Sequence, residues 1–218
     1  MTQERPRGRS PLTARLRRDS RGMALTEFAL SLPVLLVLGL GGLEVARYVL
    51  ATERISQMAM LVADNAGRVR DSIDEIDVNE VMTGAALVGE PIDFAENGRI
   101  ILSSLEQNSA KNGQWIRWQR CSGANMTASS YGPEGTGKNN STLQGFGPVG
   151  NRIAAASGTA VMAVEVFYDY RPIVPMPLVG LRHRQIHFEA AFNVRQRNDQ
   201  VLKNSKSLPK AKTSSCTQ

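Results

Sequence analysis

The sequence predicts an α+β protein in which a long N-terminal helix, transmembrane at its start and amphipathic beyond, precedes a small antiparallel sheet. Residues 28–43 carry no charge and hold a single polar side chain, Ser31. Apolar residues then recur at helical spacing up to about residue 71. Beyond residue 93, alternating apolar and polar runs are separated by turn-rich stretches. The 218 residues allow one ordinary domain with extensions.

The basic residues of the chain are concentrated at its N-terminus. Residues 1–22 contain seven arginines against Glu4 and Asp19, a charge of +5, so the rest of the chain contributes +1 to the net +6. A basic segment beside an apolar run places the N-terminus in the cytoplasm and the following domain outside. Because no aromatic residues are interleaved with these arginines to stack on bases, we expect no nucleic-acid binding.

Residues 23–50 are predicted to cross the membrane as a helix. The uncharged residues 28–43 rise about 24 Å, and extension to 23–50 spans a hydrocarbon core of about 30 Å. Glu44 and Arg47 close the run and are three residues apart, so they share a helix face. We expect them to form an ion pair near the membrane boundary.

Two cleavage patterns are possible for this N-terminus. A secretory signal peptide is cut after its apolar run at small residues, but charged residues and a tyrosine follow Leu43. The other pattern is cleavage before the apolar run, between Gly22 and Met23. An uncleaved signal anchor is the alternative to both.

The segment GMALTEF, residues 22–28, resembles a type IV prepilin processing site, with four residues between Gly22 and the pair Glu27-Phe28. Residues 21–50 as a whole resemble the N-terminal segment of the TadE-like family, the minor pseudopilins of bacterial tight-adherence (Tad/Flp) pilus systems. The resemblance includes Pro33 inside the apolar run and Glu44-x-x-Arg47 at its end, and it covers about 50 residues. It departs from many type IV pilins at Met23, where they have phenylalanine.

The resemblance implies a pilin-like fold and a set of partners. A prepilin peptidase would cut between Gly22 and Met23 on the cytoplasmic side, removing residues 1–22 as a leader. The mature helix would stay in the inner membrane or join a pilus, in contact with lipid, other minor pilins and the Tad inner-membrane assembly platform. Glu27 would neutralise the new α-amino group of a neighbouring subunit. The alternative is that Glu27 lies at headgroup depth and contacts water.

Residues 51–91 are predicted to be a helical periplasmic extension. Apolar residues follow helical spacing to about residue 71, with a possible break at Gly67. A second, short helix follows in the segment IDVNEVMTGAALVG. Asp77 and Glu80 are spaced as its capping box, and Gly89 with the following proline marks its end.

Residues 92–198 are predicted to be a β-rich periplasmic domain of about four antiparallel strands packed on the long helix. The runs GRIILSSLEQ and GQWIRWQRC form a hairpin, and GTAVMAVEVFYDYRPI pairs with HRQIHFEAAFNVRQR through a proline-rich connection. Residues 122–151, rich in Gly, Ser, Asn and Thr, are predicted to be a long exposed loop. Residues 199–218 are expected to be a flexible tail.

The two cysteines, Cys121 and Cys216, are expected to form a disulfide, because a periplasmic location is oxidising. Such a bond closes roughly 95 residues and stabilises by about 4–5 kcal/mol in the chain-entropy model. The alternative is two unpaired thiols.

The sequence contains no pattern typical of a catalytic or metal site. His183 and His187 are four residues apart, and Glu189 follows, but in a strand the two histidines lie about 13 Å apart. We therefore expect no metal, no cofactor and no enzymatic activity. The favoured function is a minor pseudopilin anchored in the inner membrane that takes part in assembling a Flp-type pilus for surface attachment. The alternative is an uncleaved signal-anchored periplasmic binding or sensory domain.

Overall fold

A computed structural model describes residues 21–173 and 183–216 and confirms the α+β class. A 48-residue helix is followed by two short helices, a four-stranded antiparallel sheet and a two-stranded parallel pair. The elements in chain order are α2 (Arg21–Arg68), β1 (Asp71–Asp74), α3 (Glu75–Gly89), a 3₁₀ turn (Glu90–Ile92), α4 (Phe94–Asn97), β2 (Gly98–Gln107), β3 (Gln114–Ser122), β4 (Ala160–Tyr170), β5 (Arg184–Asn193), β6 (Arg197–Lys203) and a 3₁₀ turn (Lys210–Lys212). The first 20 residues of the leader and the connection 174–182 lie outside the described residues.

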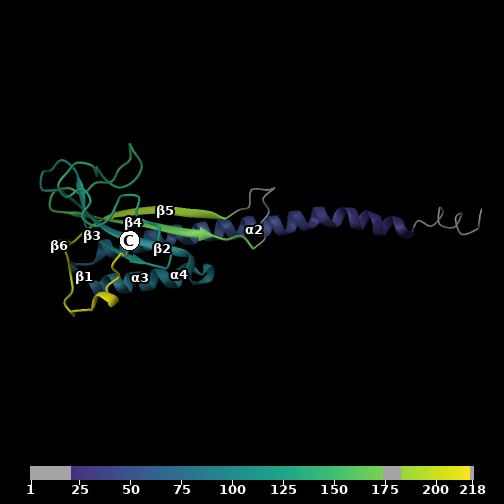
Figure 1. The fold of residues 1–218 in the computed structure, drawn as a ribbon, viewed down its shortest axis with the longest axis horizontal. Helices are drawn as coiled ribbons and strands as arrows, with labels where there is room; N and C mark the ends of the chain where they lie inside the picture. Colours follow the sequence, from purple (N-terminus) through teal and green to yellow (C-terminus); the bar gives the residue numbers. More distant parts are fainter. Residues whose placement is uncertain (1–20, 174–182, 217–218) are drawn as a thin grey trace, which may run out of the picture.

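Helix α2 is the axis of the molecule, and its two halves have different surroundings (Figure 1). The C-terminal half packs on the sheet and on α3 through small and apolar side chains at helical spacing. The buried residues of this stripe are Ala51, Ile55, Met58, Ala59, Val62, Ala63 and Ala66. The N-terminal half projects away from the domain. The helix ends at Arg68, close to the predicted end, and Gly67 does not break it.

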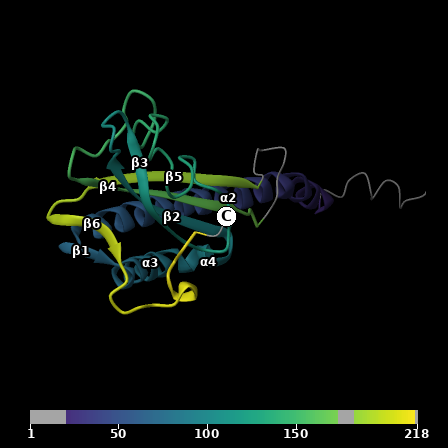
Figure 2. The same cartoon turned by 60° about the vertical axis from the view of Figure 1, so that its left-hand side comes forward.

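The four-stranded sheet has the order β3-β2-β4-β5, and every neighbouring pair is antiparallel. The predicted hairpin is therefore present as β2–β3, and the predicted pairing of the last two strands is present as β4–β5. A bulge between Ser104 and Leu105 shifts the register of β3. The sheet runs along the C-terminal half of α2 (Figures 1 and 2), with β4 running toward the projecting half and β5 running away from it.

The two faces of the sheet are covered by different parts of the chain. One face contributes Leu102, Met162 and Val164 to the main core with α2. The other face is covered by the connection between β3 and β4, which adds Leu143 and Phe146 to a second cluster. The prediction of a long exposed loop over residues 122–151 is therefore wrong for part of this segment. Tyr131, Leu143 and Phe146 pack against the sheet, while Met126 and Val149 are exposed.

Helix α3 begins at Glu75, one residue before the predicted segment. Asp74 is its N-cap and accepts a hydrogen bond from the amide of Ile76, while the side chain of Asp77 accepts one from the amide of Asp74. The capping box is thus Asp74 with Asp77 rather than Asp77 with Glu80. The earlier cap is used because β1 ends at Asp74 and delivers the chain directly into the helix.

The segment predicted as a flexible tail instead begins with a strand. Strand β6 pairs in parallel with β1. Arg197 is buried and donates to the side-chain oxygen of Gln200 (3.0 Å) and to the carbonyl of Ala66 (3.2 Å). The indole of Trp118 donates to the carbonyl of Gln200 (3.2 Å). These contacts tie the C-terminal segment to the end of α2 and to the sheet.

The packing of α2 on the sheet predicts the effect of shortening one side chain. Ile55→Ala should lower the free energy of unfolding by about 2–5 kcal/mol, because Ile55 is fully buried and its truncation leaves a cavity. Met60→Ala is the matched control, since Met60 is exposed on the same helix and its change should stay within about 0.5 kcal/mol. Chemical unfolding of the full chain in detergent measures both. Equal effects would contradict the packing described.

Candidate functional site

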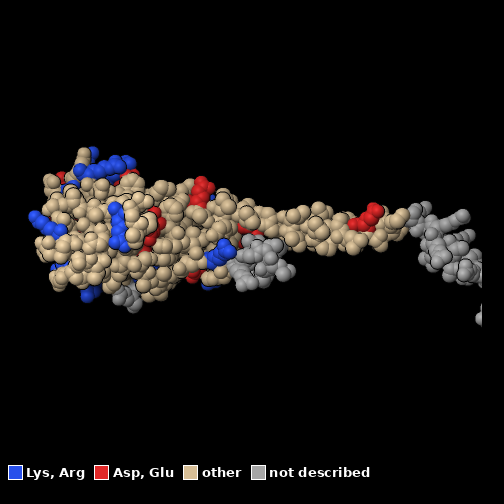
Figure 3. Space-filling model, turned by 90° about the horizontal axis from the view of Figure 1, so that it is seen from above, with Lys and Arg blue, Asp and Glu red and all other residues tan. Residues whose placement is uncertain are grey.

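The N-terminal half of α2 is an exposed apolar rod, defined as residues 22–43. Every residue from Gly22 to Leu40 is exposed, and Leu25 and Leu30 expose 72% and 77% of their surface. Figure 3 shows this rod as an almost uncharged projection, with acidic atoms only near its far end. Because a soluble monomer rarely exposes so large an apolar surface, the rod requires an apolar surrounding.

The rod has the length and composition of a membrane span. Residues 23–43 rise about 31 Å, which matches a hydrocarbon core of about 30 Å. One helix among the described residues meets the criteria of length and hydropathy for crossing a membrane, and it is α2. The helix is thus compatible with a single-pass membrane anchor.

The polar groups of the rod are satisfied within the helix, apart from one carboxylate. The hydroxyl of Thr26 donates to the carbonyl of Met23 (2.8 Å), and that of Ser31 donates to the carbonyl of Phe28 (3.1 Å). Pro33 is accommodated without ending the helix. Glu27 makes no hydrogen bond or ion pair with any described residue, and it projects from the rod one turn after Met23.

The expected cleavage site, Gly22 and Met23, lies in the first turn of α2 as the structure describes it. A methyl group added at Gly22 would meet no atom within 4 Å, and the backbone there is helical. The same holds for Gly39, farther along the rod. The fold itself therefore does not require glycine at position 22, so any requirement for it must come from an interaction with another molecule.

Glu44 joins the rod to the domain. It is 2% exposed and accepts hydrogen bonds from the hydroxyl of Tyr170 and from the amide of Ile173 (3.2 Å). The ring of Tyr170 also meets Tyr48 edge-on, with centroids 5.2 Å apart. Burial of the Tyr170 hydroxyl, together with its bond to the Glu44 carboxylate, raises the pKa of Tyr170 to about 12.

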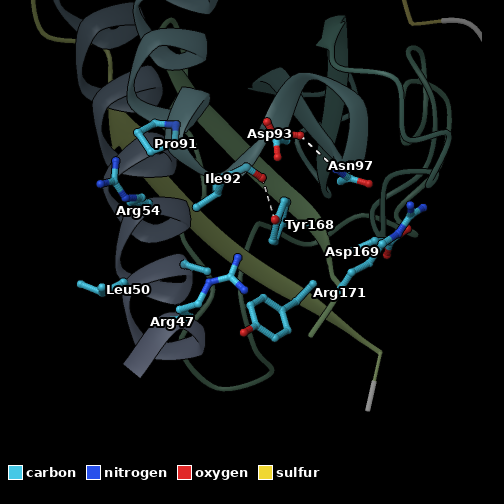
Figure 4. Close-up of a pocket in the computed structure, with 12 residues that line it drawn as sticks. Arg47, Leu50, Arg54, Pro91, Ile92, Asp93, Asn97, Tyr168, Asp169 and Arg171 are labelled. Atoms are coloured by element: carbon cyan, nitrogen blue, oxygen red, sulfur yellow. Dashed lines mark hydrogen bonds between the residues drawn. The ribbon is translucent and has the colours of Figure 1, made fainter. Parts of the chain in front are cut away.

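The expected ion pair of Glu44 with Arg47 is not among the ion pairs of the described part of the chain. Glu44 faces the end of β4 and takes its donors there, while Arg47 is exposed and lines a cavity beside Tyr168 (Figure 4). The prediction identified both residues at the boundary but not their partners, because the donors come from residues more than 120 positions later.

The two cysteines belong to the globular domain and are joined in the structure. The disulfide links Cys121, at the end of β3, to Cys216 across 95 residues of sequence. The amide of Cys121 also donates to the carbonyl of Ser214 (2.6 Å). The C-terminal segment is thereby held against the outer edge of β3.

His187 and Glu189 meet a third residue that sequence reasoning missed, Glu165 of β4. Glu165 and Glu189 are opposite one another in the β4–β5 register, and the imidazole of His187 lies 3.7 Å from each carboxylate. His183 precedes β5 and is not part of this group. Only the alternation of β4 could have placed Glu165 on this face, since no motif marks it.

The donors to these carboxylates come from the covering loop, so the group fastens that loop to the sheet. Ser129 donates its hydroxyl and Ser130 its amide to Glu165, which is 1% exposed. The hydroxyl of Tyr131 donates to Glu189 (3.0 Å). Burial, with the negative charge of Glu189 close by, raises the pKa of Tyr131 to about 12.

Comparison with known proteins gives one match. Residues 22–64 match the family model described as TadE-like protein, and this confirms the predicted resemblance over that segment. The matched segment contains the rod, Glu44 and most of the stripe of α2 that packs on the sheet. The family indicates a Tad pilus-related protein. No curated protein and no solved structure matches the chain.

The contact between Tyr170 and Glu44 predicts a pH-dependent loss of stability. Tyr170→Phe should lower the free energy of unfolding at neutral pH by about 1–3 kcal/mol, because the buried Glu44 carboxylate loses a donor. Since the pKa of Tyr170 is about 12 when folded and about 10 when unfolded, this advantage is complete below pH 10. It is lost as the pH rises toward 12, because only the unfolded phenol ionises there.

Unfolding of the full chain in detergent at several pH values measures this difference between wild type and variant. Tyr48→Phe is the control, because the Tyr48 hydroxyl makes no hydrogen bond to a described residue. A difference between wild type and Tyr170→Phe that stays constant above pH 10 would contradict the assignment.

Proposed function

We propose, from the match of residues 22–64 to the TadE-like family, that this chain is a minor pseudopilin held in the bacterial inner membrane by α2. In this role it takes part in assembling a Flp-type pilus used for surface attachment. The observation that carries the proposal is the exposed apolar rod. It has the length of a bilayer core, and it begins at a glycine that the fold does not require and bears a carboxylate one turn later. The role is structural rather than enzymatic.

The proposed topology has the N-terminus in the cytoplasm and the domain in the periplasm. The charge of +5 on residues 1–22 supports this orientation, because basic flanks are retained in the cytoplasm. The disulfide between Cys121 and Cys216 supports it independently, since disulfides persist in oxidising compartments. Both features support a periplasmic position for the domain.

The proposed processing step is cleavage between Gly22 and Met23 by a prepilin peptidase. Cleavage removes the arginine-rich leader and creates an α-amino group on Met23 at the cytoplasmic end of the rod. The open surroundings of Gly22 support this role, because the peptidase, and not packing, would then explain the glycine.

Glu27 supplies the proposed assembly contact. With residues 23–43 across the bilayer, Glu27 lies about 6 Å inside the cytoplasmic boundary, measured along the helix. An unpaired charged side chain costs about 2.5–3.5 kcal/mol at the bilayer centre on insertion scales, and less nearer the boundary, where Glu27 lies. The α-amino group of Met23 on a neighbouring subunit offers the opposite charge at nearly the same depth. Pairing the two removes much of this cost and sets the axial position of one subunit against the next.

The partners that follow from this role are the prepilin peptidase, other minor pilins, the Tad inner-membrane assembly platform and lipid. The pilin partners contact the rod, whose side chains are free of intramolecular packing from Gly22 to Leu40. The globular domain is then carried on the periplasmic side, with its sheet already closed by α2 on one face and by the loop on the other.

The processing proposal predicts the N-terminus of the mature protein. Protein isolated from membranes that contain prepilin peptidase should begin at Met23, by intact mass and N-terminal sequencing. Gly22→Ala should abolish this cleavage, while Gly39→Ala, equally free of contacts, should leave it unchanged. A wild-type membrane form that keeps residues 1–22 would instead support an uncleaved signal anchor.

The assembly proposal predicts a separate effect of the carboxylate. Glu27→Ala should be cleaved normally, but the amount of the variant incorporated into assemblies should fall at least about tenfold. The reason is that the α-amino group of Met23 on the neighbouring subunit loses its partner in the lipid. Glu53→Ala is the control, since Glu53 is exposed on the same helix outside the rod. Crosslinking of neighbouring subunits and recovery in sheared pili measure incorporation. Wild-type recovery of Glu27→Ala would refute the pairing.

A further inference from the structure

A cavity of about 310 Å³ lies at the end of the domain that faces the rod. Arg47 and Leu50 of α2 line one side, and Tyr170 and Arg171 at the end of β4 line the other. In Figure 4 the side chain of Arg47 points from α2 toward β4, whereas that of Arg171 points away from α2, beside Asp169. Pro91 and Ile92 add apolar surface. The cavity therefore combines guanidinium groups with an apolar wall.

Two of the arginines that line the cavity are available to bind an anion. Arg47 and Arg171 are exposed and form no ion pair with any described residue. Of the two aspartates in the lining, Asp169 accepts hydrogen bonds on both oxygens, from Asn125 (2.9 Å) and Gln185 (3.2 Å). The other is Asp93, so three lining arginines face two carboxylates.

The position along α2 sets the depth of these groups. If residues 23–43 fill the hydrocarbon core, Arg47 lies about 6 Å beyond it, inside a headgroup layer about 5–8 Å thick. Arg171 follows Tyr170, which contacts Glu44, so it lies near the same depth. Arg54 is about 10 Å farther along the helix and donates to the carbonyl of Val88 (3.2 Å). It therefore lies beyond the headgroups.

We infer that Arg47 and Arg171, at the same depth on two sides of the end of β4, bind the phosphate groups of anionic phospholipids in the leaflet next to the domain. Guanidinium groups recognise phosphate by charge-assisted, bidentate hydrogen bonds. Arg184, the register partner of Tyr170 at the start of β5, adds a third exposed cation at this end of the sheet. The apolar wall of Leu50 and Ile92 and the adjoining rod fit the glycerol and acyl portions. A phospholipid satisfies all of these contacts, whereas inorganic phosphate satisfies only the charge.

Lipid bound here would fix the tilt of the domain relative to the membrane. The rod alone sets only the depth of the helix, because it is apolar on all sides. Arg47 on the helix and Arg171 on the sheet bind from two elements that Glu44 already joins through Tyr170. The inference rests on the proposed membrane anchoring and adds a lipid specificity to it.

Native mass spectrometry of the full chain tests the inference, in detergent micelles supplied with equal amounts of phosphatidylglycerol and phosphatidylcholine. The wild type should retain phosphatidylglycerol preferentially. The double variant Arg47→Gln with Arg171→Gln should lower that preference on the order of 30-fold, roughly fivefold for each arginine near an anionic surface. The control is Arg70→Gln with Arg152→Gln, two exposed arginines outside this end of the domain, and it should keep the wild-type preference.

Two further measurements separate the possible failures. Insertion into vesicles of phosphatidylcholine alone tests the anchor, and its failure would overturn the proposed function together with the lipid site. Normal insertion with equal retention of both lipids, or with an unchanged preference in the Arg47/Arg171 variant, would overturn the lipid site alone. Displacement of the bound lipid by excess inorganic phosphate would also overturn it, since it would identify a site for the free anion.

Discussion

The exposed apolar surface of the N-terminal half of α2 is the constraint on which the rest of the structure depends. The side chains of this half are not buried against any other described part of the chain, whereas the same helix buries a full stripe of side chains from Ala51 onward. A helix that is apolar on all sides is stable only in lipid or among other helices. The division of α2 into a rod and a packed half therefore separates the part that requires an apolar surrounding from the part that carries the domain.

The two halves of α2 are joined at Glu44, and the contacts of Glu44 explain how the domain is held at a defined position along the helix. A buried carboxylate is tolerated because Tyr170 and the amide of Ile173 satisfy it. These donors come from the end of β4, so the sheet terminates where the rod begins. In the proposed topology the domain consequently presents the end of β4 and the start of β5 to the membrane. In the proposed pseudopilin, forces on the rod would reach the sheet through this contact and through the packed stripe.

Much of this fold could be predicted from local patterns in the sequence. The limits of β2 follow from its apolar run and the turn-forming residues after Gln107, and the stripe of α2 follows from helical spacing. The N-cap of α3 was misplaced because Asp74 and Asp77 are each followed, three residues later, by an acidic side chain that could complete a capping box. Only the end of β1 decides between these two positions. Strand β6 was missed because its partner, β1, lies more than 120 residues earlier.

The site was predicted where the chemistry is local and missed where it depends on distant residues. Gly22, Glu27 and Phe28 follow from spacing within seven residues. The partners of Glu44 could not be read from its neighbours, since a carboxylate three residues before an arginine predicts an ion pair whatever lies across the fold. Likewise the buried Glu165 is stabilised by Ser129 and Ser130 of a loop whose polar composition predicts exposure. In both cases the polar side chains are buried because distant donors satisfy them.

The central claim, that the rod lies in lipid and the membrane boundary falls at Glu44, is tested most directly by spin-label accessibility. Both cysteines of the chain are in the disulfide, so single cysteines placed from residue 25 to residue 50 can be labelled selectively in vesicles. The account predicts high accessibility to oxygen and low accessibility to a water-soluble nickel reagent from residue 28 to residue 43. It also predicts a reversal of this pattern between residues 44 and 50. Water accessibility throughout the rod, or a boundary displaced by more than one helical turn from Glu44, would contradict it.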